Sequence, residues 1–419
     1  MRIVIGRQPY CRITILRPQP NATEPSAALI LVFAAATGLI VANIYYSQPL
    51  VGLIARDLAI QASASSVLVS LTQLGYSAGL FLLVPLADRV ENRALILRLL
   101  CVSILGLALA AIAKNIAEFL IAATLIGVTS CVVQILVPMA ASLASEANRG
   151  KTVGNVMAGL LLGILLARPA ASAITYFVGW RAVFAIAALI MALLTFLLHA
   201  SLPLTRPQAN HTYRALIRSM LTLYRTEPAL RRRATYQCAA FGAFSLYWTA
   251  APLLLTSDFH LTQGGIAIFA LVGAAGVGAA PIAGRLADRG HERIGSAVAL
   301  LLVMGAFGVS ALAVSAHELV LFALSGVILD LGVQANNIFG QRVLYVLASE
   351  IRGRLNGAYM AVFFIGGAIG SAVASSSLAT GGWDRVTLIG MSAPALALVY
   401  LGKNEVTRRR RSNAAPYTE

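Results

Sequence analysis

Long runs of apolar residues follow one another along most of the chain, between Ala27 and Leu401. Most of them match the length of about 20 residues that a helix needs to cross a bilayer. Strands are not expected, because the runs are too long and do not alternate between apolar and polar residues. The expected fold class is therefore an all-α membrane protein. Twelve transmembrane helices are predicted, over residues 27–50, 64–86, 94–113, 117–141, 152–178, 182–200, 234–256, 263–286, 294–314, 318–341, 355–378 and 385–402.

The placement of positive charge predicts the orientation of these helices. Of the 32 Lys and Arg residues, all but Arg56, Lys114, Arg168, Arg181 and Arg385 fall on one side of the predicted membrane. Lys and Arg favour the cytoplasmic side, so both termini are expected there. The setting is then a multi-pass protein of a bacterial-type inner (plasma) membrane. A nucleic-acid binder would gather its charge on one domain, so no such partner is expected.

Two stretches of the chain repeat each other at a distance of about half its length. PLADRVENR (residues 85–93) has a counterpart in RLADRGHER (residues 285–293), and Gly179-Trp180 recurs as Gly382-Trp383. Internal repeats in a helical membrane protein are typical of secondary transporters, whose substrate site lies between the repeats. We therefore expect two pseudo-symmetric halves of six helices each.

The repeats divide the chain into five segments. A disordered cytoplasmic N-terminus (1–26) precedes the first six-helix bundle (27–200). A basic cytoplasmic linker (201–233) leads to the second bundle (234–402), and a basic cytoplasmic tail (403–419) follows. The linker is expected to be partly amphipathic and to lie along the membrane surface, where arginine side chains can meet anionic lipid.

Glycines spaced four apart predict where helices approach closely. The GxxxG pattern occurs at Gly75/Gly79, Gly159/Gly163 and Gly366/Gly370, in the second, fifth and eleventh predicted helices. Small residues at this spacing let two backbones come together. The eighth helix carries three further glycines, so we expect helices 2, 5, 8 and 11 to form the boundary between the halves, through these glycines.

These motifs resemble those of the major facilitator superfamily, and within it the twelve-helix drug–proton antiporter type. The phrase GRLADRGHER, with Gly284 and Asp288, is similar to the family signature between helices 2 and 3 and its echo between helices 8 and 9. The fifth helix shares glycines with the antiporter signature but has Ala167-Arg168 where that signature has Gly-Pro. Ala123 stands where the family's helix 4 carries an arginine, so its proton-coupling residues do not transfer as a set.

The two copies of the charged phrase suggest a pair of cytoplasmic gates. Asp88 and Asp288 are placed at inner helix ends, where a carboxylate can meet a helix N-terminus or a loop arginine. The alternative is that these are ordinary solvated loop charges. The gate candidates are Asp88, Arg89, Arg93, Asp288, Arg289 and Arg293.

The chemistry is expected where the two halves differ. Asp330 lies near the middle of a predicted helix and aligns with Ser130 of the first half, while Arg168 aligns with Ser371. A charge in a membrane helix costs about 2.5–3.5 kcal/mol on insertion scales and marks a functional candidate. Asp330 is therefore the candidate proton-coupling carboxylate. Arg168 is its candidate partner, paired across the boundary in one state of a transport cycle; the alternative is that Arg168 bonds helix carbonyls on its own side.

A cavity for a small organic substrate is expected between the halves. In the superfamily that the motifs resemble, helices 1, 4, 7 and 10 line it. Asp330 begins a polar row that continues through Gln334, Asn337 and Gln341, on one helix face. We expect a mostly apolar and aromatic cavity for an amphipathic compound, with Trp248 or Asp330 as the position for a cation. The alternative for each polar residue is an interhelical hydrogen bond. The candidates are Asn43, Tyr46, Gln134, Gln237, Phe241, Ser245, Trp248, Gln334 and Asn337.

The expected function is proton-coupled efflux of amphipathic organic compounds by alternating access. The runner-up is a sugar or metabolite exporter of the same fold, which would need hydroxyl-binding amides or carboxylates on both halves. A transport-inactive membrane sensor is the alternative from another class. We find no HExxH motif or phosphate loop, so neither an enzyme, a cofactor nor a metal site is expected, and a monomer suffices.

Overall fold

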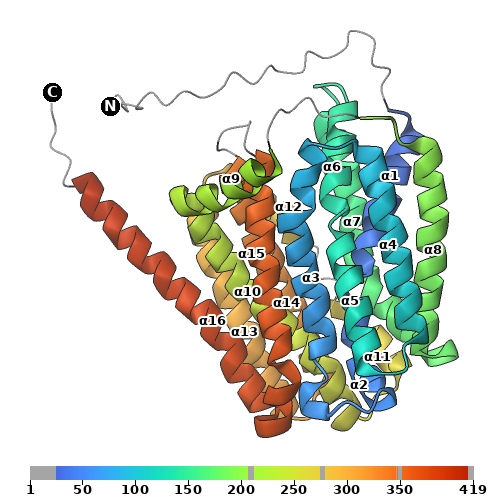
Figure 1. Cartoon of the computed structure of the whole chain (residues 1–419). Coiled ribbons are helices and arrows are strands. Elements are labelled where there is room, and N and C mark those ends of the chain that lie inside the picture. Colours follow the sequence, from blue (N-terminus) through green and yellow to red (C-terminus); the bar gives the residue numbers. More distant parts are fainter. Residues whose placement is uncertain (1–24, 206–211, 274–278, 346, 348–351, 414–419) are drawn as a thin grey trace.

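The computed structural model describes residues 25–205, 212–273, 279–345, 347 and 352–413, and every element in these ranges is a helix. Figure 1 shows them as one bundle whose long helices run side by side, with the shorter α9 lying across one end. The helices are α1 (Ala27–Ala42), α2 (Ser47–Asp57), η1 (Ala62–Ala64), α3 (Val67–Leu82), η2 (Val84–Asp88), α4 (Asn92–Ile112), α5 (Ile116–Ser130), α6 (Val133–Leu143), α7 (Arg149–Val178), α8 (Trp180–Ser201), α9 (Tyr213–Thr226), α10 (Pro228–Ser257), α11 (Gln263–Gly273), α12 (Ala279–Asp288), α13 (Glu292–Ser315), α14 (Leu319–Tyr345), α15 (Arg352–Ala372) and α16 (Ala374–Asn413).

The structure accounts for the predicted membrane helices. Eleven segments of the described chain are long and apolar enough to cross a bilayer. The remaining prediction, residues 263–286, corresponds to α11 and α12, and residues 274–278 between them lie outside the described part. A helix satisfies its own backbone hydrogen bonds, which a bilayer cannot do, so this all-α, twelve-helix arrangement is the one expected from the apolar runs.

The first and fourth predicted helices are interrupted rather than continuous. The first span consists of α1 and α2, separated by a tight turn in which Ile44 N donates to Val41 O (3.1 Å) and Tyr45 N to Ala42 O (3.0 Å). The fourth span is divided in the same way between α5 and α6, after Ser130. These i→i+3 bonds wind the chain more tightly than an α-helix, so side chains beyond each break face a different direction than a continuous helix would give them.

The glycine pairs pack helices against each other within each half. They do not join the two halves, contrary to the prediction from the sequence. A Cβ added at Gly163 would lie 2.1 Å from Gly38 O on α1, and one at Gly370 would lie 1.9 Å from Gly242 O on α10. Gly79 likewise faces Val128 on α5. The prediction that these glycines face the other half is therefore wrong. The GxxxG pattern predicts that another helix packs closely, but it does not identify that helix.

The helices predicted at the boundary do form it. Helix α3 packs against α15, and α7 packs against α11, so these elements of the first and second halves meet at the boundary. The boundary is polar here: Ser70 Oγ of α3 lies 3.2 Å from Ser371 Oγ of α15. Ser66 Oγ, at the N-cap of α3, lies 2.8 Å from Ser375 Oγ at the start of α16.

The linker contains one amphipathic helix, α9, which rests on the end of the bundle. Leu216 and Met220 on its apolar face are buried, and Met220 belongs to a cluster with Leu355 and Tyr359 of α15. The α9 residue Tyr213 donates from its hydroxyl to Leu82 O at the end of α3 (2.7 Å). The expected amphipathic character is present, but the apolar face packs against protein, so it is not left for lipid. We call this end of the bundle the linker end.

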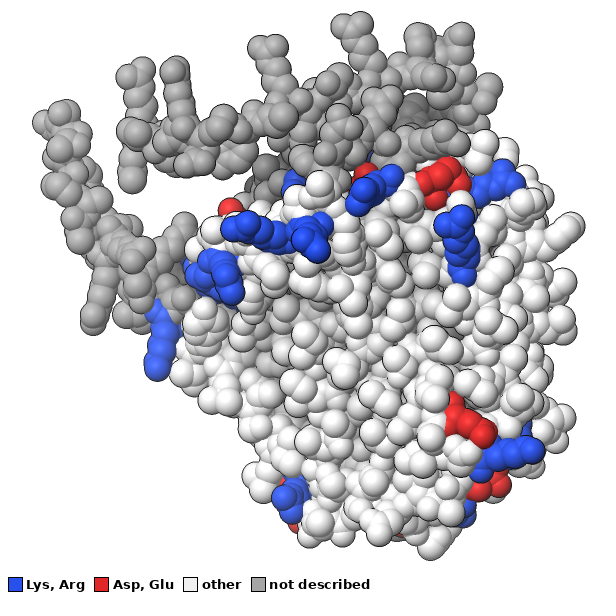
Figure 2. Space-filling view, in the orientation of Figure 1, with Lys and Arg blue, Asp and Glu red and all other residues white. Residues whose placement is uncertain are grey.

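Charge differs between the two ends of the molecule. In Figure 2, Lys and Arg predominate at the linker end, whereas basic and acidic side chains occur together at the opposite end. The expected disordered segment 1–26 falls almost wholly outside the described residues, although Ser26 caps α1 by accepting from Leu29 N (3.2 Å). In the tail, α16 continues to Asn413.

Candidate functional site

A cavity of about 500 Å³ lies between the two halves and opens at the linker end. At its mouth are Asp88, Met220 and Arg354, and at its inner end are Tyr45 and Phe244. Residues of α1, α6, α10 and α14 line it, which belong to the predicted helices 1, 4, 7 and 10, and α7 and α15 contribute as well. Its size is that of pockets that bind drug-sized organic compounds.

The cavity brings together five of the predicted residues. Gln134, Gln237, Phe241, Gln334 and Asn337 all line it. The first of these comes from α6 of the first half, and the other four come from α10 and α14 of the second half. The predicted polar face of α14 therefore does point into the space between the halves.

The other cavity candidates lie elsewhere. Asn43, Ser245 and Trp248 are buried but do not line the cavity, and neither does Tyr46, whose neighbour Tyr45 does. The tight turn after α1 changes the register that a continuous helix would have had. Ser245 instead exchanges hydrogen bonds with Gln73 of α3 (3.2 and 3.3 Å), which links the halves.

Several cavity residues were not predicted. Tyr76, Asn356, Phe363 and Phe364 come from α3 and α15, which were expected only to pack the boundary. Tyr76 and Phe364 touch across it, with ring centroids 4.3 Å apart. Asn356, which lies one turn beyond the arginines that begin α15, is the signal that could have identified this wall.

The amides of the cavity differ in how their hydrogen bonds are used. Gln237 Oε1 accepts from Asn336 Nδ2 (2.7 Å), a bond inside the second half. Gln134 Oε1 accepts from Asn356 Nδ2 (3.2 Å), which joins the two halves. Asn337 Oδ1 accepts from the Tyr359 hydroxyl (3.2 Å). The Gln134–Asn356 bond must therefore break or move when the halves part at this level.

A charged cluster lies behind the inner end of the cavity. The Arg168 guanidinium stands over the rings of Trp248 (4.5 Å to the centroid), Phe244 (4.9 Å) and Tyr45 (5.2 Å). Its Nε donates to Gln48 Oε1 (2.8 Å). Such cation–π contacts are strongest where the cation is desolvated, and Arg168 is only 5% exposed.

Asp330 belongs to the same cluster through Trp248. The indole Nε1 of Trp248 donates to Asp330 Oδ1 (2.8 Å), so one ring contacts the cation on its face and the carboxylate at its edge. Arg168 and Asp330 themselves are not within 4.0 Å of each other, since Asp57–Arg181 is the one ion pair found among the described side chains. The predicted direct pair is thus bridged by an aromatic residue in this state, and whether it forms in another state stays a prediction.

Contacts between the halves close the cavity beyond this cluster, at the end opposite its mouth. The bonds Ser66–Ser375 and Ser70–Ser371 lie there, while nearer the linker end Ser77 Oγ donates to Ala361 O (2.8 Å). The cavity therefore has access from one end of the bundle, and its closed side is built from contacts between the halves.

One of the predicted gate residues, Asp88, lies at the mouth of the cavity. Arg93 of α4 instead donates to Leu202 O (3.3 Å). Arg89 and Arg289 are exposed, and Arg293 lies in the first turn of α13. The side chain of Asp288 lies outside the described part of the chain. The two-gate arrangement accordingly stays a prediction.

Glu91 in the same loop was not predicted. Its carboxylate accepts from Arg93 N (2.8 Å) and Ala94 N (2.7 Å) and so caps α4. Burial works to raise the pKa of Glu91, but these N–H donors and that of Thr205 outweigh it and hold the pKa below its ordinary value. Ser, Thr, Asp and Asn are the residues preferred at this position, and Glu is not among them, so the sequence carried no strong signal for this cap.

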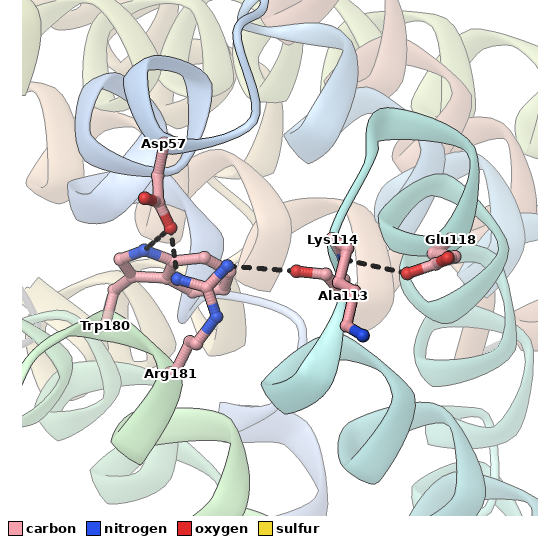
Figure 3. Close-up of polar contacts among 6 residues, drawn as sticks. All are labelled: Asp57, Ala113, Lys114, Glu118, Trp180 and Arg181. Carbon is pink, nitrogen blue, oxygen red and sulfur yellow. Dashed lines mark hydrogen bonds and ion pairs between the residues drawn. The ribbon is translucent and has the colours of Figure 1, made fainter.

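The opposite end of the first half is held by a polar cluster, shown in Figure 3. Asp57 at the end of α2 pairs with Arg181 of α8 and accepts from Trp180 Nε1 (3.2 Å). Arg181 also donates to Ala113 O (3.0 Å) and stacks on the Trp180 ring (4.3 Å). These contacts tie three helix ends together within one half, so they can move as one body.

Comparison with known proteins now identifies the family. The profile of the Major Facilitator Superfamily matches residues 30–370 and 234–417. The chain belongs to this superfamily. It is therefore a multi-pass membrane transporter, a class distinct from enzymes, and its architecture suits a small-molecule substrate.

Bacterial relatives of the chain carry transporter names. The chain is 41% identical over 386 residues to "Uncharacterized transporter YgaY" of Escherichia coli O157:H7, covering 91% of this chain and 96% of that protein. It is 33% identical over 384 residues to "Probable transporter SCO4007" of Streptomyces coelicolor, covering 89% and 87%.

Solved structures agree on the fold. A POT family transporter in complex with 5-aminolevulinic acid superposes with a TM-score of 0.72 at 14% identity, over 89% of this chain and 95% of that one. An inward-facing, unoccupied bacterial homologue of the human lysosomal transporter Spinster gives 0.67 at 12% identity, over 90% and 94%. Identities this low support the fold alone.

Proposed function

We propose that this protein is a proton-coupled secondary transporter that exports amphipathic organic compounds from the cytoplasm by alternating access. The observation that carries the proposal is the position of the Arg168–Trp248–Asp330 cluster. It lies at the closed side of the cavity, with Arg168 from one half and Trp248 and Asp330 from the other. A change of charge here acts directly on the contact that keeps that side shut.

The orientation of the bundle supports a substrate path that begins in the cytoplasm. The linker end carries most of the Lys and Arg side chains visible in Figure 2, and positive charge favours the cytoplasmic side of an inner membrane. The cavity then faces the cytoplasm. An amphipathic compound would enter it from there and leave on the other side, once the contacts around Ser66 and Ser375 have opened.

Asp330 is the group we assign to proton coupling. In the present state the carboxylate accepts from the Trp248 indole N–H, and the Arg168 cation lies over the face of the same ring. Both neighbours stabilise its charged form. When the halves part at this level, the carboxylate loses the nearby cation that favoured its charged form, and neutralisation by an external proton becomes more favourable.

This difference gives the cycle its direction. Protons bind when the site is open to the outside and leave when Arg168 returns, on the cytoplasmic side. Substrate binding in the cavity would supply the energy for the opposite movement, because it replaces contacts such as Gln134–Asn356 that hold the halves together there. A ligand can shift such an equilibrium only by its difference in affinity for the two states.

The proposal is tested in inverted membrane vesicles that are energised to be acidic inside. Acridine orange trapped in the vesicles reports proton release when candidate compounds are added. We expect compound-dependent proton efflux with the wild-type protein and none with Asp330→Asn. The control is Asp384→Asn, which makes the same chemical change at an exposed site. Undiminished gradient-driven transport by Asp330→Asn would rule out this assignment.

A further inference from the structure

Amide side chains line the cavity on both halves, and the proton mechanism does not use them. Gln334, Asn337 and Gln341 follow one face of α14 at spacings of three and four residues, and Asn356 of α15 and Gln134 of α6 face the same space. Each amide offers both a donor and an acceptor. Together they can recognise groups that also donate and accept, such as hydroxyls and amides.

Part of this hydrogen-bonding capacity is unused in the present state. Among the described residues, Gln334 and Gln341 have no hydrogen-bond partner, and the buried Oδ1 of Asn356 has none. A buried polar group without a partner is costly. A ligand that supplies the missing partners would be held by these side chains. Gln237 has little hydrogen-bonding capacity left for a ligand, because its amide already bonds Asn336 and Val333.

The inner part of the cavity has no charged side chain to neutralise an ionic ligand. Among its described lining residues the charged ones are Asp88 and Arg354, from the end of η2 and the start of α15. Both belong to the mouth. A charged ligand group that moved further in would lose its hydration without gaining a counter-ion, which is unfavourable.

The aromatic floor also disfavours a cation. Tyr45 and Phe244 form the inner end of the cavity, and the Arg168 guanidinium already lies 5.2 and 4.9 Å from their ring centroids. Trp248, which the sequence suggested as a cation site, is 2% exposed and in contact with the same guanidinium. An arginine is always charged, and Asp330 does not itself line the cavity. A second cation stacked on these rings would therefore meet the fixed positive charge of Arg168.

An uncharged aromatic or aliphatic ring fits the floor instead. Phe241 and Phe364, with centroids 5.1 Å apart, continue the apolar wall from Phe244 toward the amides, and Tyr76 adds to it across the boundary. Such a wall favours a flat apolar group through burial. The cavity therefore has an apolar end and an amide-lined side.

We propose that the substrates are uncharged amphipathic compounds, in which a hydroxylated, glycoside-like part binds Gln334, Asn337, Gln341 and the Gln134–Asn356 pair, and a flat apolar part lies against Tyr45 and Phe244. This proposal rests on the transport function above and narrows its substrate class. It replaces the cation suggested by the sequence.

Three probes separate the alternatives in a binding experiment on the purified full-length protein, with no proton gradient. Methylumbelliferyl β-D-glucoside is uncharged, methylumbelliferyl β-D-glucuronide differs from it by one carboxylate, and ethidium is a flat cation. Binding is followed as quenching of tryptophan fluorescence, with thermal stabilisation as a second readout. We expect the glucoside to bind and the glucuronide and ethidium to bind at least about tenfold more weakly.

Two variants assign the binding to the amides. Gln334→Leu with Gln341→Leu keeps side-chain size but removes two unpartnered amides, and we expect glucoside affinity to fall about tenfold or more. Gln61→Leu is the matched control, because Gln61 is exposed at the opposite end of the bundle; its affinity should equal the wild type. Unaltered glucoside binding by the double variant would overturn the assignment.

The remaining outcomes also decide between the two proposals. Failure of the glucoside to bind at about 10 mM, or equal or tighter binding of ethidium or the glucuronide, overturns the uncharged substrate class. Glucoside binding without any proton-driven movement in vesicles leaves the substrate class standing and refutes the proton-coupled function. Proton-driven efflux of ethidium without glucoside binding supports the proton-coupled function and refutes the uncharged substrate class.

Discussion

The guanidinium of Arg168 lies 4.5 Å from the ring centroid of Trp248, whose indole N–H donates to Asp330 at 2.8 Å. The arginine comes from α7 of the first half and the tryptophan from α10 of the second. Both side chains are buried. One aromatic ring thus connects a cation and a carboxylate that do not touch, across the boundary that must open during transport.

This connection predicts that changes at Arg168 and Asp330 are not additive. Arg168→Gln or Asp330→Asn alone leaves an uncompensated buried charge, which is strongly destabilising. The double variant removes both charges, so its loss of stability should be smaller than the sum of the single losses by about 0.5–3 kcal/mol. Thermal unfolding of the four proteins in detergent measures this. Additive losses would mean that the two charges do not interact in the folded protein.

The serine contacts predict a disulfide that locks the cavity side open. Ser66 Oγ and Ser375 Oγ lie 2.8 Å apart, close enough for cysteines at these positions to approach disulfide geometry. After replacement of the chain's four cysteines by alanine, the pair Ser66→Cys and Ser375→Cys should cross-link on oxidation. We expect transport to stop and to return with reductant, because the halves can no longer part here.

Single cysteine variants are the controls for this experiment. Ser66→Cys and Ser375→Cys alone should keep transport under the same oxidising conditions. Complete cross-linking with undiminished transport would show that this contact does not have to open, and it would remove the closed side of the cavity from the proposed cycle.

The architecture was predictable from sequence because its cause is local. Each membrane helix must satisfy its own backbone hydrogen bonds and present apolar side chains to lipid. The run of apolar residues that results can be read directly from the sequence. Lipid-facing residues such as Phe177 and Leu105, which are 80% and 66% exposed, satisfy this requirement directly. The repeated phrase around Asp88 and Asp288 then implies two halves.

The site was predictable only in part, because partners and register are not local. The polar face of α14 appears in the cavity as expected, since one continuous helix carries it. Tyr45 replaces Tyr46 because the turn after Ala42 changes the register, and no residue pattern announced that turn. The bridge from Arg168 to Asp330 through Trp248 depends on how three helices meet, which spacing along the chain does not reveal.

Glu91 predicts a pH-dependent contribution to stability at the linker end. Its capping bonds hold its pKa below the ordinary value, so the stabilisation is present above the unfolded-state pKa of about 4.3 and is lost as the pH falls through the lowered folded-state pKa. Glu91→Gln should lower stability by about 1 kcal/mol at neutral pH. That deficit should shrink as the pH falls below about 4, in thermal unfolding series. Glu146→Gln, at an exposed loop position, is the control, and a deficit independent of pH would contradict the capping role.

The close approach of α10 and α15 predicts an unequal effect of identical glycine substitutions. In Gly370→Ala the new Cβ would lie 1.9 Å from Gly242 O, which is backbone and cannot rotate away. The two helices would have to separate, and overpacking of this kind costs about 1–3 kcal/mol or more. Gly308→Ala, in α13, meets nothing within 4 Å and should leave stability unchanged or slightly raised, because alanine is the better helix former. Thermal unfolding of the two variants compares them directly. Equal stability would mean that α10 and α15 do not pack through these glycines. The second half would then lack the close glycine contact that Gly38 and Gly163 make in the first half.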